Sequence, residues 1–136
     1  MRILGIDWGK AWLGIAVSDP NGGIAFPRPA LKNDGSCMAK LKEITEKDEV
    51  GFIVIGLPVN DNGTESVSSA AVRAFGDKLK KLLKKDIIFF DERHTTRIAA
   101  ENLKPLKKDR REMKKIVDSA SAALILQDYL DAQGRK

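Results

Sequence analysis

Three carboxylates stand at positions from which they could take part in chemistry. Asp7 follows a short apolar run at residues 3–6, and Glu92 closely follows another at residues 87–90, so each comes at the end of a predicted buried strand. If the first strand runs parallel to the later ones, their carboxyl ends share one sheet edge, where open α/β sheets bind ligands. Asp118 lies in the last predicted helix, and the small residues after it would let that helix approach the same edge.

Carboxylates that converge on one point repel each other, and they stay ionised together only when a cation neutralises them. Oxygen ligands select a hard ion, Mg²⁺ or Mn²⁺, over zinc. Such an ion also binds phosphate oxygens, and it can activate water and stabilise the leaving oxygen of a phosphodiester. Asp7, Glu92 and Asp118 are therefore predicted to be the metal ligands and catalytic residues of a nuclease.

Each of these carboxylates also has an explanation without chemistry. Asp7 could simply end a strand, and the other two have basic neighbours suited to ordinary ion pairs. These neighbours are Arg93 and Arg97 for Glu92, and Lys114 and Lys115 for Asp118. A different interpretation assigns residues 7–9 (DWG) to the phosphate-binding hairpin of actin-like ATPases and sugar kinases. Those folds enclose a nucleotide between two such domains, whereas 136 residues provide for one.

A basic segment precedes Asp118. Residues 104–115 contain seven basic and two acidic side chains. An acidic site repels phosphate, so a nearby positive surface is needed to hold a polyanion. The residues predicted to bind substrate in this way are Lys107, Lys108, Arg110 and Arg111. The alternative is a solvated run of charge.

Hydrophobic periodicity predicts the elements that must position these residues. Strands are expected at residues 3–8, at 13–17, at 24–31 and at 52–55, with a helix over the Met38, Leu41 and Ile44 stripe between the last two. The third strand carries Pro27 and Pro29, which cannot donate to a ladder, so it must lie at a sheet edge.

The second half of the chain alternates helices with one strand. A long helix begins at Thr64 or Ser66, a buried strand covers residues 87–90, and a short helix covers residues 96–103. A last helix runs from near Arg110 to Gly134. The apolar stripe of the long helix is expected to comprise Val67, Ala71, Ala74, Phe75, Leu79, Leu82 and Leu83. The fold class is therefore α/β: a mixed five-stranded sheet, with three antiparallel strands and then two parallel ones, flanked by helices.

Composition excludes several classes of protein. A single cysteine, Cys37, rules out an intrachain disulfide, and a single histidine, His94, rules out a two-histidine zinc site. The formal net charge of +5 suits a polyanionic partner. No apolar run approaches the ~18 residues of a membrane helix, so we expect one cytoplasmic domain over residues 1–136 with no membrane contact.

The order of several short motifs resembles the YqgF (RuvX-type) family of RNase H-fold proteins, described as pre-16S ribosomal RNA nucleases and Holliday junction resolvase-like proteins. The resemblance spans nearly the whole chain. Its segments are residues 3–7 (ILGID) with Gly9, 14–19 (GIAVSD), 56–58 (GLP) with Asn60, 63–65 (GTE), 72–75 (VRAF), 91–93 (DER) with 95–96 (TT), and Asp118 followed by 122–123 (AA), 125–127 (ILQ) and 129–130 (YL).

The resemblance implies an RNase H-like fold and a divalent-metal nuclease site on Asp7, Glu92 and Asp118. It also implies a role in maturing precursor 16S ribosomal RNA, with the ribosomal precursor particle as partner. Two departures bear on the site: Trp12 stands where the family usually has arginine, and Ser121 follows Asp118 where related resolvases bring a further acidic residue. One firmly held metal is therefore the safer expectation.

We accordingly expect a metal-dependent endonuclease acting on structured RNA. One alternative is a Holliday junction resolvase-like DNA nuclease, which would act as a dimer because it cuts two symmetric strands. Another is a non-catalytic RNA-binding factor for ribosome assembly. The sequence leaves open whether the protein is a monomer or a homodimer.

Overall fold

The fold is built on one five-stranded sheet. The computed structural model describes residues 1–60, 62–91 and 110–134, and the side chains of the last range only from 119 to 133. The strand order is β3-β2-β1-β4-β5. The strands are β1 (Arg2–Asp7), β2 (Trp12–Ser18), β3 (Ala25–Lys32), β4 (Val50–Leu57) and β5 (Asp86–Asp91).

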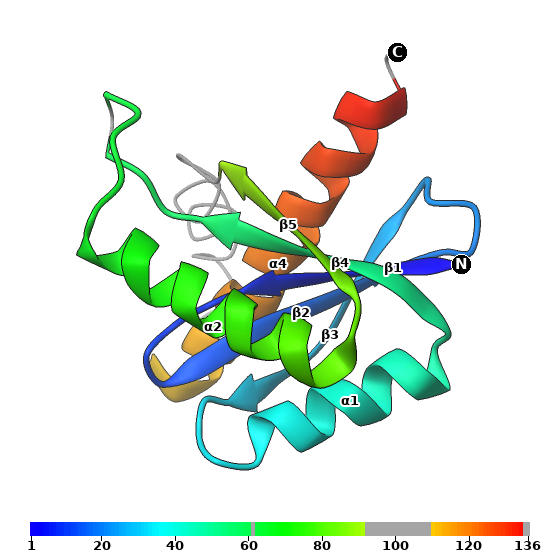
Figure 1. Ribbon diagram of the computed structural model, residues 1–136, viewed down its shortest axis with the longest axis horizontal. Coiled ribbons are helices and arrows are strands. Elements are labelled where there is room, and N and C mark those ends of the chain that lie inside the picture. Colours follow the sequence, from blue (N-terminus) through cyan, green and yellow to red (C-terminus); the bar gives the residue numbers. More distant parts are fainter. Residues whose placement is uncertain (61, 92–109, 135–136) are drawn as a thin grey trace.

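Strand directions confirm the predicted mixed α/β sheet. β1 pairs antiparallel with β2, and β2 pairs antiparallel with β3. β4 runs parallel to both β1 and β5. The carboxyl ends of β1, β4 and β5 therefore lie at one edge of the sheet (Figure 1).

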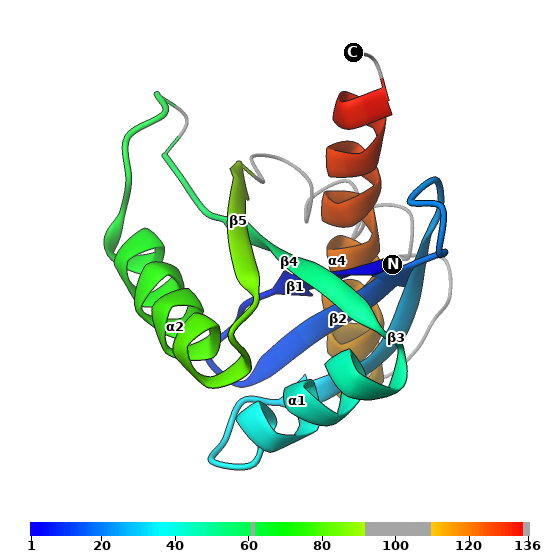
Figure 2. The ribbon, with the colours of Figure 1, turned by 45° about the vertical axis from the view of Figure 1, so that its right-hand side comes forward.

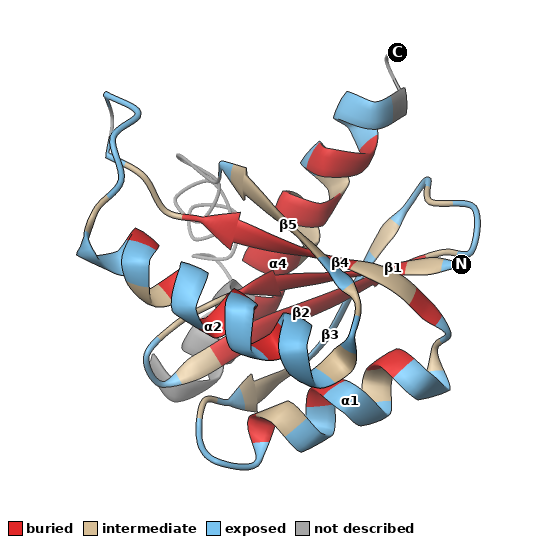
Figure 3. Ribbon diagram, viewed as in Figure 1, coloured by how far each residue is buried: buried red, intermediate tan, exposed pale blue. Residues whose placement is uncertain are grey.

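Helices cover both faces of the sheet. α1 (Cys37–Lys47) and α2 (Val67–Leu83) pack on one face, and α4 (Arg110–Gly134) packs on the other (Figure 2). Alternation along β1 divides the core accordingly: Leu4 and Ile6 belong to the cluster beneath α1 and α2, whereas Ile3 belongs to the cluster beneath α4. Figure 3 shows the central strands buried between these two layers.

The two edge strands differ from the interior ones. β3 lies at the outer edge beyond β2, as Pro27 and Pro29 require, so this prediction is confirmed. β5 is the other edge strand, and its residues 87–90 are only half-buried. The expectation of a fully buried strand there is wrong, because an edge strand in the described chain has only one strand neighbour. The short helix expected at residues 96–103 lies outside the described residues.

The buried face of α2 is rotated from the predicted stripe. Val67 is 89% exposed and Leu82 is 46% exposed, whereas Phe75 and Leu79 are buried as expected. Gly76 explains the rotation: a Cβ added there would lie 2.5 Å from the Phe89 ring, so only glycine lets α2 settle this closely on β5. Among the described residues, no helix has the length and apolar character needed to cross a membrane.

Candidate active site

Asp7 is a buried carboxylate at the carboxyl end of β1. It is the last residue of the strand and only 8% exposed. Side chains alternate along a strand, so position 7 falls on the same sheet face as Ile3, which is the face covered by α4. The sheet therefore places this predicted site residue at the expected edge, facing the helix that carries Asp118.

Contacts along α4 fix how this helix lies against the sheet. Ser119 Oγ donates to the carbonyl of Arg28 at 2.7 Å, and Gln127 Oε1 accepts from the amide of Ala25 at 3.0 Å. Through the ladder, Arg28 is level with Ile15 and Ile6, near the carboxyl end of β1. The amino-terminal half of α4 therefore lies at the carboxyl end of β1. The backbone of Asp118, one residue before Ser119, lies at the same end of the sheet as Asp7.

The close approach of α4 depends on small residues, as the sequence predicted. Ala122 is fully buried on the side of the helix that meets the sheet, and Gly5 faces it on β1. A Cβ added to Gly5 would lie 3.3 Å from the carbonyl oxygen of Ala122. Nothing larger than glycine fits between the two backbones without displacement. The helix is therefore seated directly on β1, two residues before Asp7.

The remaining predicted site residues are not all within the described structure. Glu92 follows Asp91, the last residue of β5, and lies outside the described residues together with Lys107 and Lys108. Arg110 and Arg111 begin α4, but their side chains, like that of Asp118, are not described. The metal triad and the basic substrate surface therefore stay predictions.

The oxygen atoms that are described at this end of the molecule suit a hard cation. Asp7 supplies a buried carboxylate. Ser121 Oγ, three residues after Asp118, is buried and has no hydrogen-bond partner among the described residues. Oxygen donors of this kind match Mg²⁺ or Mn²⁺. Within residues 1–60, 62–91 and the described part of α4, no group of three metal-binding side chains assembles, so a complete ligand set would need Glu92 and Asp118.

The hairpin between β1 and β2, which follows Asp7, is held by hydrogen bonds from Asn33. The sequence did not indicate these bonds. The carbonyl of Gly9 accepts from Asn33 Nδ2 at 2.7 Å, and the amide of Asn33 donates to the carbonyl of Ala11 at 2.9 Å. A Cβ on Gly9 would lie 2.7 Å from the carbonyl oxygen of Trp12, so the turn requires glycine. Asn33 thereby ties the hairpin that follows Asp7 to the loop after β3.

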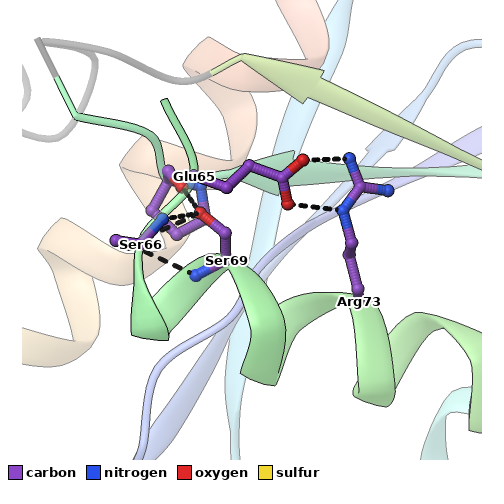
Figure 4. Close-up of polar contacts among 5 residues, drawn as sticks. Glu65, Ser66, Ser69 and Arg73 are labelled. Atoms are coloured by element: carbon purple, nitrogen blue, oxygen red, sulfur yellow. Dashed lines mark hydrogen bonds and ion pairs between the residues drawn. The ribbon is translucent and has the colours of Figure 1, made fainter. Parts of the chain in front are cut away.

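An ion pair between Glu65 and Arg73 lies at the same edge of the sheet, and the sequence pattern did not predict it. Arg73 of α2 meets Glu65 with two nearly parallel contacts, Nε to Oε1 at 2.6 Å and Nη2 to Oε2 at 2.9 Å (Figure 4). The guanidinium also lies over the Phe89 ring, 5.1 Å from its centroid. The hydrogen bonds from Arg73 lower the pKa of the exposed Glu65 carboxyl, and Glu65 in turn raises the pKa of Arg73. The pair joins the loop after β4 to both α2 and β5.

Comparison with known proteins decides the family. The sequence profile of the RuvX family, described as Holliday junction resolvase, matches residues 1–132. The chain belongs to the RuvX family. Its RuvX relatives include a "Putative pre-16S rRNA nuclease" of Clostridium tetani, 44% identical over 97% of each chain, and one of Thermoanaerobacter pseudethanolicus, 39% identical over the full length of both. Family and relatives together support a nuclease role.

Solved structures agree on the fold of this RuvX chain. Thermus thermophilus RuvC matches with a TM-score of 0.58 at 13% identity, covering 98% of this chain and 97% of that one. The same protein in complex with a Holliday junction substrate matches with a TM-score of 0.61 at 13% identity, over 100% and 97% of the two chains. The fowlpox virus Holliday junction resolvase matches with a TM-score of 0.55 at 11% identity, covering 98% of this chain and 99% of that one. The RNase H-like fold predicted from sequence is confirmed by these likenesses.

Proposed function

We propose that this RuvX protein is a divalent-metal-dependent endonuclease that hydrolyses phosphodiester bonds in structured RNA during maturation of precursor 16S ribosomal RNA. The observation that carries the proposal is the buried carboxylate of Asp7 at the carboxyl end of β1, on the face where α4 is seated. In sheets with parallel strands, this edge is where ligands bind. We expect the enzyme to act in the cytoplasm on the ribosomal precursor particle.

Asp7, Glu92 and Asp118 would hold Mg²⁺ or Mn²⁺ in this mechanism. The bound ion supplies an activated water and stabilisation of the leaving oxygen. Asp7 contributes a carboxylate whose position is fixed by the strand and by the hairpin that Asn33 supports. Glu92 and Asp118 would complete the ligand set and orient the attacking water. Lys107, Lys108, Arg110 and Arg111 would hold the phosphate backbone and offset the repulsion between substrate and acidic site.

RNA is favoured over DNA by the printed name of the relatives matched over nearly their whole length, "Putative pre-16S rRNA nuclease". The second candidate is a Holliday junction resolvase-like DNA nuclease. It is favoured by the family description and by the fold shared with RuvC bound to a junction. The third candidate is a non-catalytic RNA-binding assembly factor, which would have the same fold but would bind RNA without cleaving it. The three candidates differ in substrate and in turnover, so one assay separates them.

The decisive experiment compares cleavage of precursor 16S ribosomal RNA with cleavage of a four-way DNA junction, with and without Mn²⁺, by the wild type and Asp7→Asn. We expect metal-dependent RNA cleavage by the wild type and none by Asp7→Asn. Junction cleavage with intact RNA would favour the resolvase, and RNA binding without cleavage would favour the assembly factor. Asp48→Asn, a carboxylate just before the amino end of β4, is the matched control and should retain full activity.

A further inference from the structure

We propose that the groove between β3 and α1 is a docking site for a protein partner, and that it binds a peptide segment in which an acidic side chain stands next to an apolar one. A cavity of about 250 Å³ opens between this strand and this helix. The groove lies on the sheet face opposite α4 and the candidate active site. The inference therefore goes beyond the proposed nuclease function and does not depend on it.

The side chains of β3 that line the groove lie on the face that α1 covers. Arg28 and Leu31 pair with Ile15 and Leu13, which both belong to the core cluster beneath α1 and α2. Paired residues on neighbouring strands project to the same side of a sheet. Phe26, two residues before Arg28 on the same face, is 50% exposed. The groove is thus the margin at which α1 ceases to cover the sheet.

Two of the side chains that line the groove are apolar. Leu31 of β3 and Ile44 of α1 pack against the core cluster, but each is only half-buried, so part of its surface stays in contact with water. Pockets that enclose a whole small molecule usually measure from roughly 300 Å³ upwards, so this cavity suits a single side chain. An apolar side chain of a partner would cover both residues and anchor the contact.

Charged side chains surround the two apolar ones. The cations are Arg28, Lys40 and Lys47, and the anions are Glu43 and Asp48. Three cations against two anions leave one positive charge in excess. In the part of the chain that the structure describes, neither lysine takes part in an ion pair. One carboxylate on the partner would balance the excess charge of the groove.

Arg28 is the cation best prepared to receive that carboxylate. Its Nη2 lies 3.6 Å from Asp48 Oδ1, and the side chains of Arg28 and Asp48 are 45% and 17% exposed. This distance is too long for a hydrogen bond, so the pair orients the guanidinium without using its N–H donors. A guanidinium binds a carboxylate through two parallel hydrogen bonds, and holding it in place beforehand reduces the entropic cost of binding.

A peptide fits this lining better than a nucleic acid does. A sugar-phosphate backbone brings a negative charge with every nucleotide, and Glu43 and Asp48 would repel it. A peptide can instead present one carboxylate among uncharged residues. It would not bind as a strand added to β3, because Pro27 and Pro29 remove two donors from that strand. Recognition therefore depends on the two side chains, one acidic and one apolar.

The test selects peptides from a random library on the full chain and compares the affinity of a selected peptide for three variants. Arg28→Gln removes the guanidinium. Lys40→Glu combined with Lys47→Glu reverses two exposed charges at the groove. Lys80→Glu combined with Lys81→Glu is the matched control, because both lysines are exposed in the last turn of α2, as Lys47 is in the last turn of α1. Thermal unfolding checks that each variant is folded.

We expect the selected peptides to share an acidic residue next to an apolar one. Arg28→Gln should weaken the binding of such a peptide about tenfold, the effect of losing hydrogen bonds to a charged group, and the double reversal at the groove should weaken it at least as much. The control should bind like the wild type at physiological salt, where exposed charges beyond about 8 Å are screened. If Arg28→Gln fails to fold, the double reversal at exposed positions carries the test.

Nuclear magnetic resonance locates the binding surface. The amide signals of residues 26–31 and 40–48 should shift when the selected peptide is added, and single-stranded RNA should neither shift them nor displace the peptide. A library that yields no acidic and apolar pair would overturn the proposal, as would equal affinity for the groove variants and the control. RNA that displaces the peptide from these residues would also overturn it. No measurement here uses cleavage, so the nuclease function is judged separately.

Discussion

Gly5 of β1 and Leu126 of α4 lie so close that a Cβ added to the glycine would sit 2.9 Å from the Cβ of the leucine. No side-chain rotation can relieve such a contact, because the Cβ of Leu126 is fixed to its backbone. A single missing methyl group thus determines how near α4 comes to the strand that ends in Asp7.

Gly5→Ala should therefore destabilise the protein and weaken catalysis together. Overpacking of this kind costs about 1–3 kcal/mol, which for a chain of this size lowers the melting temperature by several degrees, at roughly 2–8 °C per kcal/mol. Thermal and urea unfolding measure the effect. Gly35→Ala is the matched control, since a Cβ there has no neighbour within 4 Å. Equal stability of the two variants would show that α4 does not rest on β1 as described.

Metal binding should be visible as stabilisation. Mn²⁺ or Mg²⁺ at a hundredfold excess over the dissociation constant should add about 2.7 kcal/mol, because the unfolded chain lacks the assembled ligands. Asp7→Asn, Glu92→Gln and Asp118→Asn should each reduce the shift in melting temperature. Glu46→Gln, on the exposed side of α1, should not. A shift of the same size in all four variants would place the metal elsewhere.

The basic segment before Asp118 should control affinity rather than turnover. Replacing Lys107, Lys108, Arg110 and Arg111 with glutamine should weaken binding to unrelated RNA sequences alike, because backbone contacts carry no sequence information. The slope of log affinity against log salt should fall by roughly 0.7–0.9 for each phosphate that the variant no longer neutralises. The same substitution of Lys78, Lys80 and Lys81 on α2 and of Lys84, the residue that caps its carboxyl end, removes equal charge from another surface. Identical slopes in both quadruple variants would show that the segment does not bind the substrate backbone.

The Glu65–Arg73 pair should contribute to stability in a pH-dependent way. Arg73 lowers the pKa of Glu65 in the folded protein through its hydrogen bonds. A depressed carboxyl pKa stabilises the folded state above the unfolded pKa, about 4.3, and this contribution is lost as the pH falls through the folded value. Wild type and Glu65→Gln should therefore differ most in urea unfolding at neutral pH and converge once the pH has fallen below the lowered folded pKa of Glu65. A difference that persists unchanged at acid pH would contradict the assigned role of the pair.

The parts of the fold that follow from local pattern were predictable. Pro27 and Pro29 required β3 to be an edge strand, and the small residues around Ala122 indicated a close helix. The buried face of α2 was misassigned because it depends on Gly76 meeting Phe89, a contact between different elements. Periodicity within one helix carries no information about such a partner.

The candidate site divides in the same way. Asp7 could be placed from its strand, because two antiparallel steps and a helical crossover make β4 parallel to β1. The hydrogen bond between Ser119 and Arg28, which orients α4, joins residues 91 positions apart, so no local sequence pattern predicts it. The Glu65–Arg73 ion pair was missed for a related reason: Glu65 lies in the loop before α2, so the periodicity of the helix does not place it beside Arg73.

The prolines of β3 also govern how the molecule meets copies of itself. An open sheet edge is a template on which another strand can pair and so propagate aggregation. Pro27 and Pro29 remove two donors from this edge strand, and the register shift between Leu13 and Ile15 in the neighbouring strand disturbs its regularity. The sheet cannot be continued regularly past β3. Strand addition at that edge is therefore disfavoured as a route to a symmetric dimer of this protein.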